Sequence, residues 1–153
     1  MVEVEVKDCK GHYALVIKSK VKVEDLPMKL GELYGELFGY VGAKGIAPLG
    51  APFVDYNSMD PAGWDIEAGV YVPEGTMGQG RIETRKYPPQ KCVHAWHIGA
   101  YDNLKQTYDG ISEWVGKQGL EFAAGPRELY HSTPGTEPAK MRTEIVWPVR
   151  KKA

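Results

Sequence analysis

This sequence of 153 residues contains little cysteine, no long apolar run and no excess of charge of either sign. Its two cysteines, Cys9 and Cys92, are far apart in the chain and show no Cys-x-x-Cys spacing, so a structural disulfide is not indicated. No apolar run approaches the roughly 18 residues that a membrane span requires. Met1 is followed by alternating valine and glutamate, which is unlike a signal peptide. We therefore expect a domain of the reducing cytoplasm with no membrane partner.

The charge balance and the spacing of reactive residues exclude further classes. The chain has 19 Lys and Arg against 20 Asp and Glu, a net charge of −1, whereas nucleic-acid binders are commonly basic. Its four histidines and two cysteines lack the spacing of a zinc site. Neither a phosphate-binding glycine loop nor a Ser/His/Asp or Cys/His set is recognisable. The sequence predicts no direct nucleic-acid partner, no metal and no cofactor.

The two halves of the sequence, however, resemble each other. A shift of 78 positions brings the apolar stripe Leu26, Leu30, Leu33 and Leu37 onto Leu104, Tyr108, Ile111 and Val115. Farther along the shift relaxes to 74–77, so that Tyr56 meets Tyr130 and Glu67 meets Glu144. A period near half the chain length indicates two copies of one supersecondary unit. We predict one domain, residues 1–153, with modules at about 1–75 and 80–150 and a ligand groove between them.

The residue pattern of each module predicts the order strand, strand, helix, strand, strand. The two helices, at about 25–40 and 101–118, carry apolar residues at helical spacing and end near glycines, Gly42 and Gly45 in the first case. Alternating or apolar runs predict strands at about 2–7, 13–20, 52–56, 64–72, 81–87, 91–98, 127–132 and 141–149, with loops at 57–63 and 133–138. The fold class is α+β, a pseudo-twofold duplication of a strand-helix-strand-strand module with an extra first strand and mainly antiparallel sheets.

Three glycines recur every four residues on the first helix, at positions 31, 35 and 39. Each glycine inside a helix costs up to about 1 kcal/mol relative to alanine, so a compensating gain is expected. Close packing of the helix on the sheet is the first explanation. Close approach of a ligand or of a second helix is the alternative.

Glu144 is the first candidate for a functional residue, because it interrupts an otherwise apolar strand. A carboxylate among apolar neighbours costs several kcal/mol unless something compensates for it. Three interpretations remain open: Glu144 pairs with a cationic ligand, it acts as a general base on water, or it is a solvated or tyrosine-bonded strand residue. Alternation places Arg142, Glu144 and Val146 on one face of the strand.

Glu67 is the counterpart of Glu144 in the other copy, and it has the same structural alternative of a solvated strand residue. Two such carboxylates near a twofold axis would suit a shared water or a dication. Nine tyrosines and four tryptophans offer amphipathic rings for a pocket wall. The ring candidates for ligand binding are Tyr56, Trp64, Trp96, Tyr101, Tyr130 and Trp147, with packing in the core as the alternative for each.

The second copy resembles the GyrI-like family, also called the AraC-type effector-binding domain. The resemblance rests on His97-Ile98-Gly99-Ala100-Tyr101 with Leu104, on Trp114, on Gly125-Pro126 with Glu128 and Tyr130, and on Thr143-Glu144-Ile145 before Trp147-Pro148-Val149. It covers nearly the whole chain, and the ordered set together with the duplication makes it fairly specific. It implies two pseudo-twofold modules with a small, often aromatic or cationic ligand bound between them. Many members are fused to a helix-turn-helix regulator. Because residue 2 already starts the first module, we expect a stand-alone domain here.

Three functions follow from the residues and the resemblance. The first is a binding protein for a lipophilic, aromatic or cationic small molecule, held by Glu144, Glu67 and aromatic walls. The second is a hydrolase that adds water to cyclopropane-bearing compounds, with Glu144 as general base and the Tyr101 hydroxyl as donor to the carbonyl. The third is a protein-interaction module, since one stand-alone relative is implied to modulate DNA gyrase. The sequence leaves the oligomeric state open.

Overall fold

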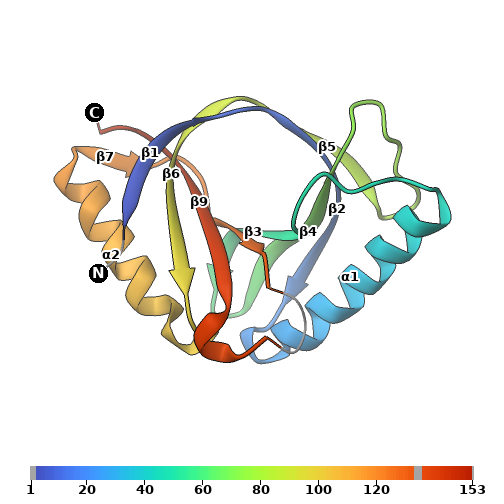
Figure 1. The fold of residues 1–153 in the computed structure, drawn as a ribbon, viewed down its shortest axis with the longest axis horizontal. Helices are drawn as coiled ribbons and strands as arrows, with labels where there is room; N and C mark the ends of the chain where they lie inside the picture. The colour runs from blue at the N-terminus through green and yellow to red at the C-terminus, as the bar shows by residue number, and fades with distance from the viewer. Residues whose placement is uncertain (1–2, 133–135, 153) are drawn as a thin grey trace. The chain divides into compact units, whose positions relative to one another are not determined.

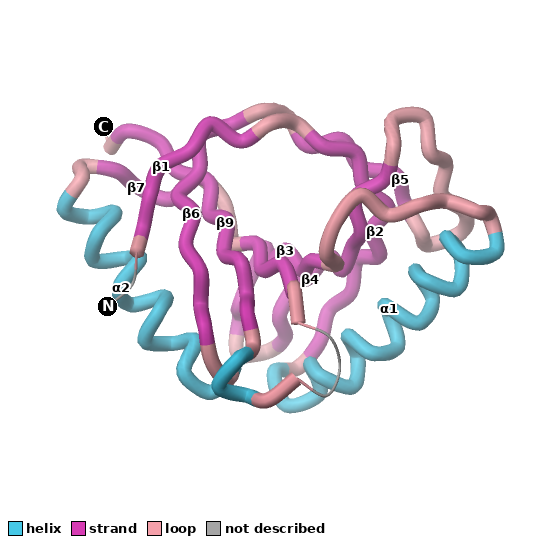
Figure 2. Tube along the Cα trace, in the orientation of Figure 1, coloured by secondary structure: helices cyan, strands magenta, loops and turns pink. Residues whose placement is uncertain are grey.

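The computed structural model describes residues 3–132 and 136–152, and Figure 1 labels its two long helices and most of its strands. The strands are β1 (Val4–Cys9), β2 (His12–Val21), β3 (Phe53–Asp60), β4 (Gly63–Val72), β5 (Glu83–Tyr87), β6 (Gln90–Ile98), β7 (Leu120–Phe122), β8 (Arg127–Tyr130) and β9 (Arg142–Lys151). The helices are α1 (Leu26–Ala43) and α2 (Leu104–Lys117), with short 3-10 turns η1 (Val23–Asp25), η2 (Tyr101–Asn103) and η3 (Pro138–Lys140). The predicted α+β class is confirmed, and Figure 2 distinguishes the helices from the strands. Residue 2 of the predicted first strand and residues 133–135 of the predicted loop lie outside the described residues.

The chain divides into two compact units, each with an antiparallel sheet and one long helix. Unit 1 comprises Met1–Cys9 and Gln90–Ala153, and unit 2 comprises Lys10–Pro89. In unit 1 the strand order is β1-β6-β9-β8, and β7 also pairs with β9. In unit 2 the order is β5-β2-β4-β3. The central strands β2 and β4 are buried along most of their length, and β6 and β9 carry core residues on the face that α2 covers.

The edge strands are exchanged between the two halves of the sequence. β1 lies in the first half of the chain but pairs with β6 in the second, with Val6 opposite Val93. β5 lies in the second half but pairs with β2 in the first, with Leu15 opposite Thr84. Backbone pairing therefore groups the strands differently from their order in the chain. The predicted modules at about 1–75 and 80–150 stay a prediction, and so does the groove between them.

The loop predicted at 57–63 is wrong. β3 continues to Asp60 and β4 begins at Gly63, so Pro61 and Ala62 alone form the turn of a long hairpin. The backbone N–H of Ala62 donates a hydrogen bond of 2.8 Å to the Asp60 carboxylate, a local Asx contact that closes the turn. Asn57 and Ser58 favour turns by themselves, but pairing with β4 overrides that preference, with a register shift between Tyr56 and Ser58.

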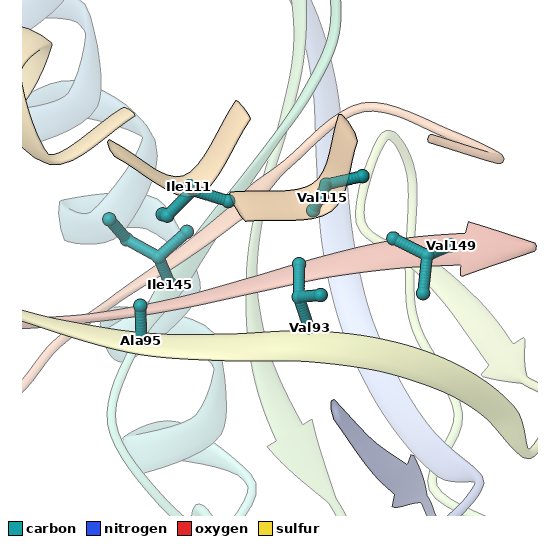
Figure 3. Close-up of a cluster of buried hydrophobic side chains, with 6 residues drawn as sticks. All are labelled: Val93, Ala95, Ile111, Val115, Ile145 and Val149. Atoms are coloured by element: carbon teal, nitrogen blue, oxygen red, sulfur yellow. The ribbon is translucent and has the colours of Figure 1, made fainter. Parts of the chain in front are cut away.

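The core of unit 1 forms between α2 and one face of β6 and β9 (Figure 3). Its members are Val93, Ala95, Ile111, Val115, Ile145 and Val149, all buried. The α2 residues Ile111 and Val115 belong to the predicted stripe, and Tyr108 and Trp114 pack against the same cluster. Burial of each large side chain contributes about 1.5–3 kcal/mol. Much of this face is therefore filled by packing against α2.

In unit 2 the predicted stripe of α1 is buried at Leu33 and Leu37, whereas Leu26 and Leu30 are half-buried. Val41 extends the buried face, and the helix contacts β2 and β4. The helix ends at Ala43, and Gly45 follows with a φ of 66°, a left-handed conformation that glycine adopts without strain. The predicted close packing of Gly31, Gly35 and Gly39 is wrong. A Cβ atom added at any of them would meet nothing within 4 Å, because they lie on the side of the helix away from its buried stripe.

This exposure predicts that Gly35→Ala stabilises the chain. Alanine adds no contact there, but it restricts the unfolded backbone and suits a helix interior, with a gain of up to about 1 kcal/mol. Urea unfolding followed by far-ultraviolet circular dichroism measures the change. Unchanged or lower stability of this variant would contradict the prediction. It would indicate that a group packs closely on this side of α1 and leaves no room for a methyl group.

Among the residues that the structure describes, no helix is both long enough and apolar enough to cross a membrane.

Candidate functional site

In unit 1, Glu144 lies on the face of the sheet opposite to α2. It sits between Trp96 on β6 and Leu129 on β8, directly opposite each. Its neighbours in the strand, Thr143 and Ile145, point to the other face, where Ile145 joins the helix-covered core. The predicted shared face of Arg142, Glu144 and Val146 thus gains His94 and Trp96 from β6, because Val146 is opposite His94.

Two histidines hold the Glu144 carboxylate. The Nε2 atom of His94 lies 2.8 Å from Oε2, and the Nε2 atom of His131 lies 2.8 Å from Oε1. The side chain of Glu144 is 21% exposed, and that of His94 is 8% exposed. The hydrogen bond from His94 lowers the pKa of Glu144, burial opposes this, and the hydrogen bond from His131 adds to the lowering. Glu144 is therefore a half-buried carboxylate that stays ionised at neutral pH.

The indole of Trp96 is the aromatic element of this cluster. The imidazole of His94 meets it edge-on at 5.8 Å between centroids, and that of His131 is tilted at 5.0 Å. The guanidinium of Arg142 lies over the ring at 4.4 Å from its centroid, a cation–π contact. The ring therefore already binds one cation of the chain itself.

A surface pocket of about 490 Å³ opens beside this cluster. It is lined by Glu3, Val4, Glu5, His94, Trp96 and Ile98, so β1 and β6 form its walls. Glu5 lies 3.5 Å from Nδ1 of His94 and 3.2 Å from the Lys7 ammonium. The pocket joins carboxylates to an indole, a combination that suits an organic cation more than an anion.

In unit 2, Glu67 is far more buried than Glu144, at 3% exposure. Its Oε1 atom accepts hydrogen bonds from Nη1 of Arg85 at 2.9 Å and from Nδ2 of Asn57 at 3.1 Å. Its Oε2 atom has no hydrogen-bond partner among the described residues. A buried carboxylate costs several kcal/mol unless paired, so Arg85 is the principal compensation.

Aromatic rings accompany Glu67 on its face of the sheet. Phe53 is directly opposite Gly69, and its ring stacks on Tyr71 at 4.8 Å and meets Tyr87 edge-on at 6.0 Å. The Tyr87 hydroxyl donates a 2.7 Å hydrogen bond to the buried Asp55, which is directly opposite Glu67. Arg85 lies over the Tyr87 ring at 5.3 Å, so one guanidinium links the carboxylate to the rings.

Most of the predicted aromatic residues lie on the faces away from the two glutamates. In unit 1, Tyr130 is opposite Thr143, and the Tyr101 ring meets Tyr130 edge-on at 5.9 Å. Tyr130 donates a 2.8 Å hydrogen bond to the buried Glu128, and Tyr108 also donates to this carboxylate. Burial raises the pKa of Tyr101, and the nearby Glu128 carboxylate adds to the rise. Tyr101 and Glu144 are thus on opposite sides of β9, so the structure does not bring the pair required for the hydrolase together.

The remaining predicted rings make packing contacts. Trp147 stacks on Phe122 at 3.6 Å and donates its indole N–H to the carbonyl oxygen of Ala124 at 2.8 Å. In unit 2, Tyr56 is opposite Ile66 and meets Trp64 edge-on at 5.8 Å. Alternation places these two rings away from Glu67. Of the six predicted rings, Trp96 alone shares a sheet face with one of the two glutamates.

Sequence reasoning missed the partners of both glutamates: His94 and His131 in unit 1, and Phe53, Asp55, Asn57, Tyr71, Arg85 and Tyr87 in unit 2. Part of the signal was present. His94 is two positions before Trp96, and Tyr71 is four positions after Glu67, so strand alternation placed each on the relevant face. No local pattern pointed to His131 or Arg85, which come from other strands or loops. His94 and His97, three positions apart in β6, face opposite sides of the sheet, since His97 bonds Thr107 of α2 at 2.7 Å.

The two cysteines, which the repeat does not align, are neighbours in space. Cys92 is opposite Lys7, so Cys9 lies diagonally across the β1–β6 pair on the same face. Both are free thiols. Burial raises the pKa of Cys92 to about 12, with a contribution from its hydrogen bond to Cys9. Across residues 3–132 and 136–152, no group of three His, Cys, Asp or Glu side chains is arranged to hold a metal ion.

Residues 3–150 match the model of the GyrI-like small molecule binding domain. The crystal structure of the EcmrR C-terminal domain is similar with a TM-score of 0.85 at 23% identity, covering 99% of each chain. In the cryo-EM structure of the EcmrR–DNA complex, the match covers 98% of this chain and 58% of the EcmrR chain. This chain therefore spans little more than half of that regulator's length. No curated protein matches the chain at a significant level.

Two other solved structures share the fold at lower identity. SAV2435 bound to tetraphenylphosphonium has a TM-score of 0.66 at 13% identity, covering 97% of this chain and 94% of SAV2435. A hydrolase from Listeria innocua has a TM-score of 0.72 at 16% identity, covering 97% of this chain and 92% of the hydrolase. At these identities the likeness shows the fold alone.

Proposed function

The chain belongs to the GyrI-like small-molecule-binding family, and from this premise we propose that its ligand is a lipophilic organic cation recognised by Glu144 and Trp96. One observation carries the proposal: a half-buried, ionised carboxylate lies directly across the strand pair from an indole, next to a pocket lined by further carboxylates. Partial burial strengthens the attraction between carboxylate and cation relative to water. The indole adds cation–π attraction and apolar area.

A lipophilic cation fits this site better than a neutral or anionic molecule. Glu144, Glu3 and Glu5 supply negative charge at one face, whereas Arg142 is engaged with the Trp96 ring. A ligand that stacks on Trp96 takes its other face or displaces the guanidinium. Glu67 of unit 2, whose buried Oε2 atom has no hydrogen-bond partner among the described residues, is a separate candidate residue with its own ring neighbours. Tyr56, Trp64, Tyr101, Tyr130 and Trp147 are assigned to packing, because their contacts lie away from both glutamates.

We also propose that these residues act in the cytoplasm without direct contact to nucleic acid. Free thiols at Cys9 and Cys92 suit a reducing compartment. A net charge of −1 offers no general attraction to phosphates.

The test uses two ions of the same shape and opposite charge. Tetraphenylphosphonium is the cation, because a protein of the same fold is described bound to it, and tetraphenylborate is its anionic counterpart. We expect calorimetry at neutral pH to show saturable binding of tetraphenylphosphonium and at least about tenfold weaker binding of tetraphenylborate, since Coulomb attraction changes sign between them. Equal affinity for the two would leave hydrophobic contact as the sole interaction and would remove the charge recognition from the proposal.

A further inference from the structure

The contacts of the Glu144 carboxylate are unusual because both partners are histidines. Each carboxylate oxygen lies 2.8 Å from one imidazole Nε2. Histidine is the side chain that commonly changes charge between pH 5 and 8. Neutral imidazoles that donate Nε2–H leave Glu144 with its full negative charge, whereas protonated imidazoles would cancel it. The charge offered to a ligand therefore depends on two protons.

His94 is also close to a second carboxylate. Its Nδ1 atom is 3.5 Å from Oε1 of Glu5, on the opposite side of the ring from Glu144. A proton on Nδ1 would turn His94 into a cationic bridge between the two acids. A protonated His94 would neutralise the carboxylate charge that the proposed ligand requires, and it would do so in the wall of the pocket.

The other charged groups around Glu144 are guanidinium, ammonium and carboxylate groups. Arg142 lies over the neighbouring Trp96, Arg127 on β8 is opposite Val146, and Lys7 pairs with Glu5. Side chains of these types ordinarily titrate outside the range from about pH 5.5 to 7.5, whereas imidazole is the type that titrates within it. The hydrogen bonds from the two histidines lower the pKa of Glu144, which takes this carboxylate farther from that range.

We propose that His94 and His131 control cation binding at Glu144, so that an organic cation binds with release of protons from these imidazoles and binds more tightly as pH rises. This inference rests on the proposed function, and it assigns two residues that set the charge selectivity of the site. An organic cation and a proton then compete for the same carboxylate.

The experiment measures tetraphenylphosphonium binding from pH 5.5 to 7.5. Each proton released on binding contributes up to tenfold in affinity per pH unit. We expect the affinity of the natural chain to rise about tenfold or more over this range. Calorimetry at pH 6 in two buffers with different ionisation enthalpies should show protons leaving the protein on binding.

The matched variants are His94→Gln, His131→Gln and the double variant. A glutamine amide retains an N–H donor for Glu144 but does not titrate. We expect the double variant to bind with nearly constant affinity over the same range, and each single variant to lose about half of the proton release. The neutral triphenylphosphine oxide should bind independently of pH.

The outcomes separate the two proposals. Cation binding whose affinity is the same at pH 5.5 and 7.5, or a slope that persists in the double variant, would overturn the role of the histidines and leave the cation site intact. Should the double variant fail to fold, the single variants decide, because unchanged proton release in both contradicts the inference. Absence of cation binding at every pH would overturn the proposed function together with this inference.

Discussion

Glu144→Gln is expected to weaken the binding of tetraphenylphosphonium at least about tenfold, with less than about a threefold effect on the neutral triphenylphosphine oxide. Glutamine keeps the shape and one acceptor oxygen but removes the charge, so the loss isolates the Coulomb contribution. A factor of ten corresponds to about 1.4 kcal/mol, a modest demand for a carboxylate that is 21% exposed. Titration calorimetry at neutral pH with the two phosphorus compounds measures both effects.

The control for this substitution is Glu121→Gln. Glu121 belongs to the same unit, pairs with Arg150 at the surface and lies outside the candidate site. The Glu121→Gln substitution removes the same charge from the chain, so general charge effects appear equally in both variants. An equal loss of affinity for the cation and the neutral compound in Glu144→Gln would mean that the substitution disturbed the pocket and that charge recognition lies elsewhere, with Glu67 as the next residue to substitute.

Gly69→Ala is expected to destabilise the chain by about 3 kcal/mol, the upper part of the usual range for overpacking a core. A methyl group there would lie 2.6 Å from Cζ of Phe53, 2.8 Å from Cγ1 of Val16 and 3.0 Å from the backbone oxygen of Leu15. The Phe53 ring is fully buried, and rings on two other strands contact it, so it has no free space to enter. The oxygen of Leu15 belongs to the β2–β4 pair and is fixed by it.

Urea unfolding measures this loss as a lower midpoint, and Gly35→Ala is the matched control because the same methyl group meets open space there. The two substitutions are expected to change stability in opposite directions. A loss below about 0.5 kcal/mol for Gly69→Ala would show that Phe53 moves freely. The rings of Phe53, Tyr71 and Tyr87 beside Glu67 would then not be rigidly packed.

Much of the local structure follows from short-range patterns. Leu33 and Leu37 of the predicted stripe are buried on α1, and Ile111 and Val115 are buried on α2. The likeness to the GyrI-like family, recognised from the segments around Tyr101 and Glu144, is confirmed over residues 3–150. These features depend on residues a few positions apart, which is the range that helical and strand periodicity reports.

Two predictions were wrong, the loop at 57–63 and the close packing of the α1 glycines. The hairpin at Asp60 was missed because turn-forming residues continue the strand when a partner strand is available. The glycines of α1 were expected against the sheet, although each is two positions from Leu33 or Leu37, which is roughly the opposite side of a helix from the buried stripe. The rings were chosen for their chemistry, and five of the six predicted lie away from both glutamates.

The sequence by itself determined both helices, the strands other than β7, and the position of Glu144 in an apolar strand, because each rests on the fixed geometry of a helix or a strand. Only the tertiary structure decided that Leu120–Phe122 forms β7, that β1 pairs with β6, and that His94 and His131 hold Glu144. Strand pairing and side-chain contacts between residues far apart depend on which backbone edges and faces meet on folding. No periodic pattern in the sequence identifies which of these distant residues come together.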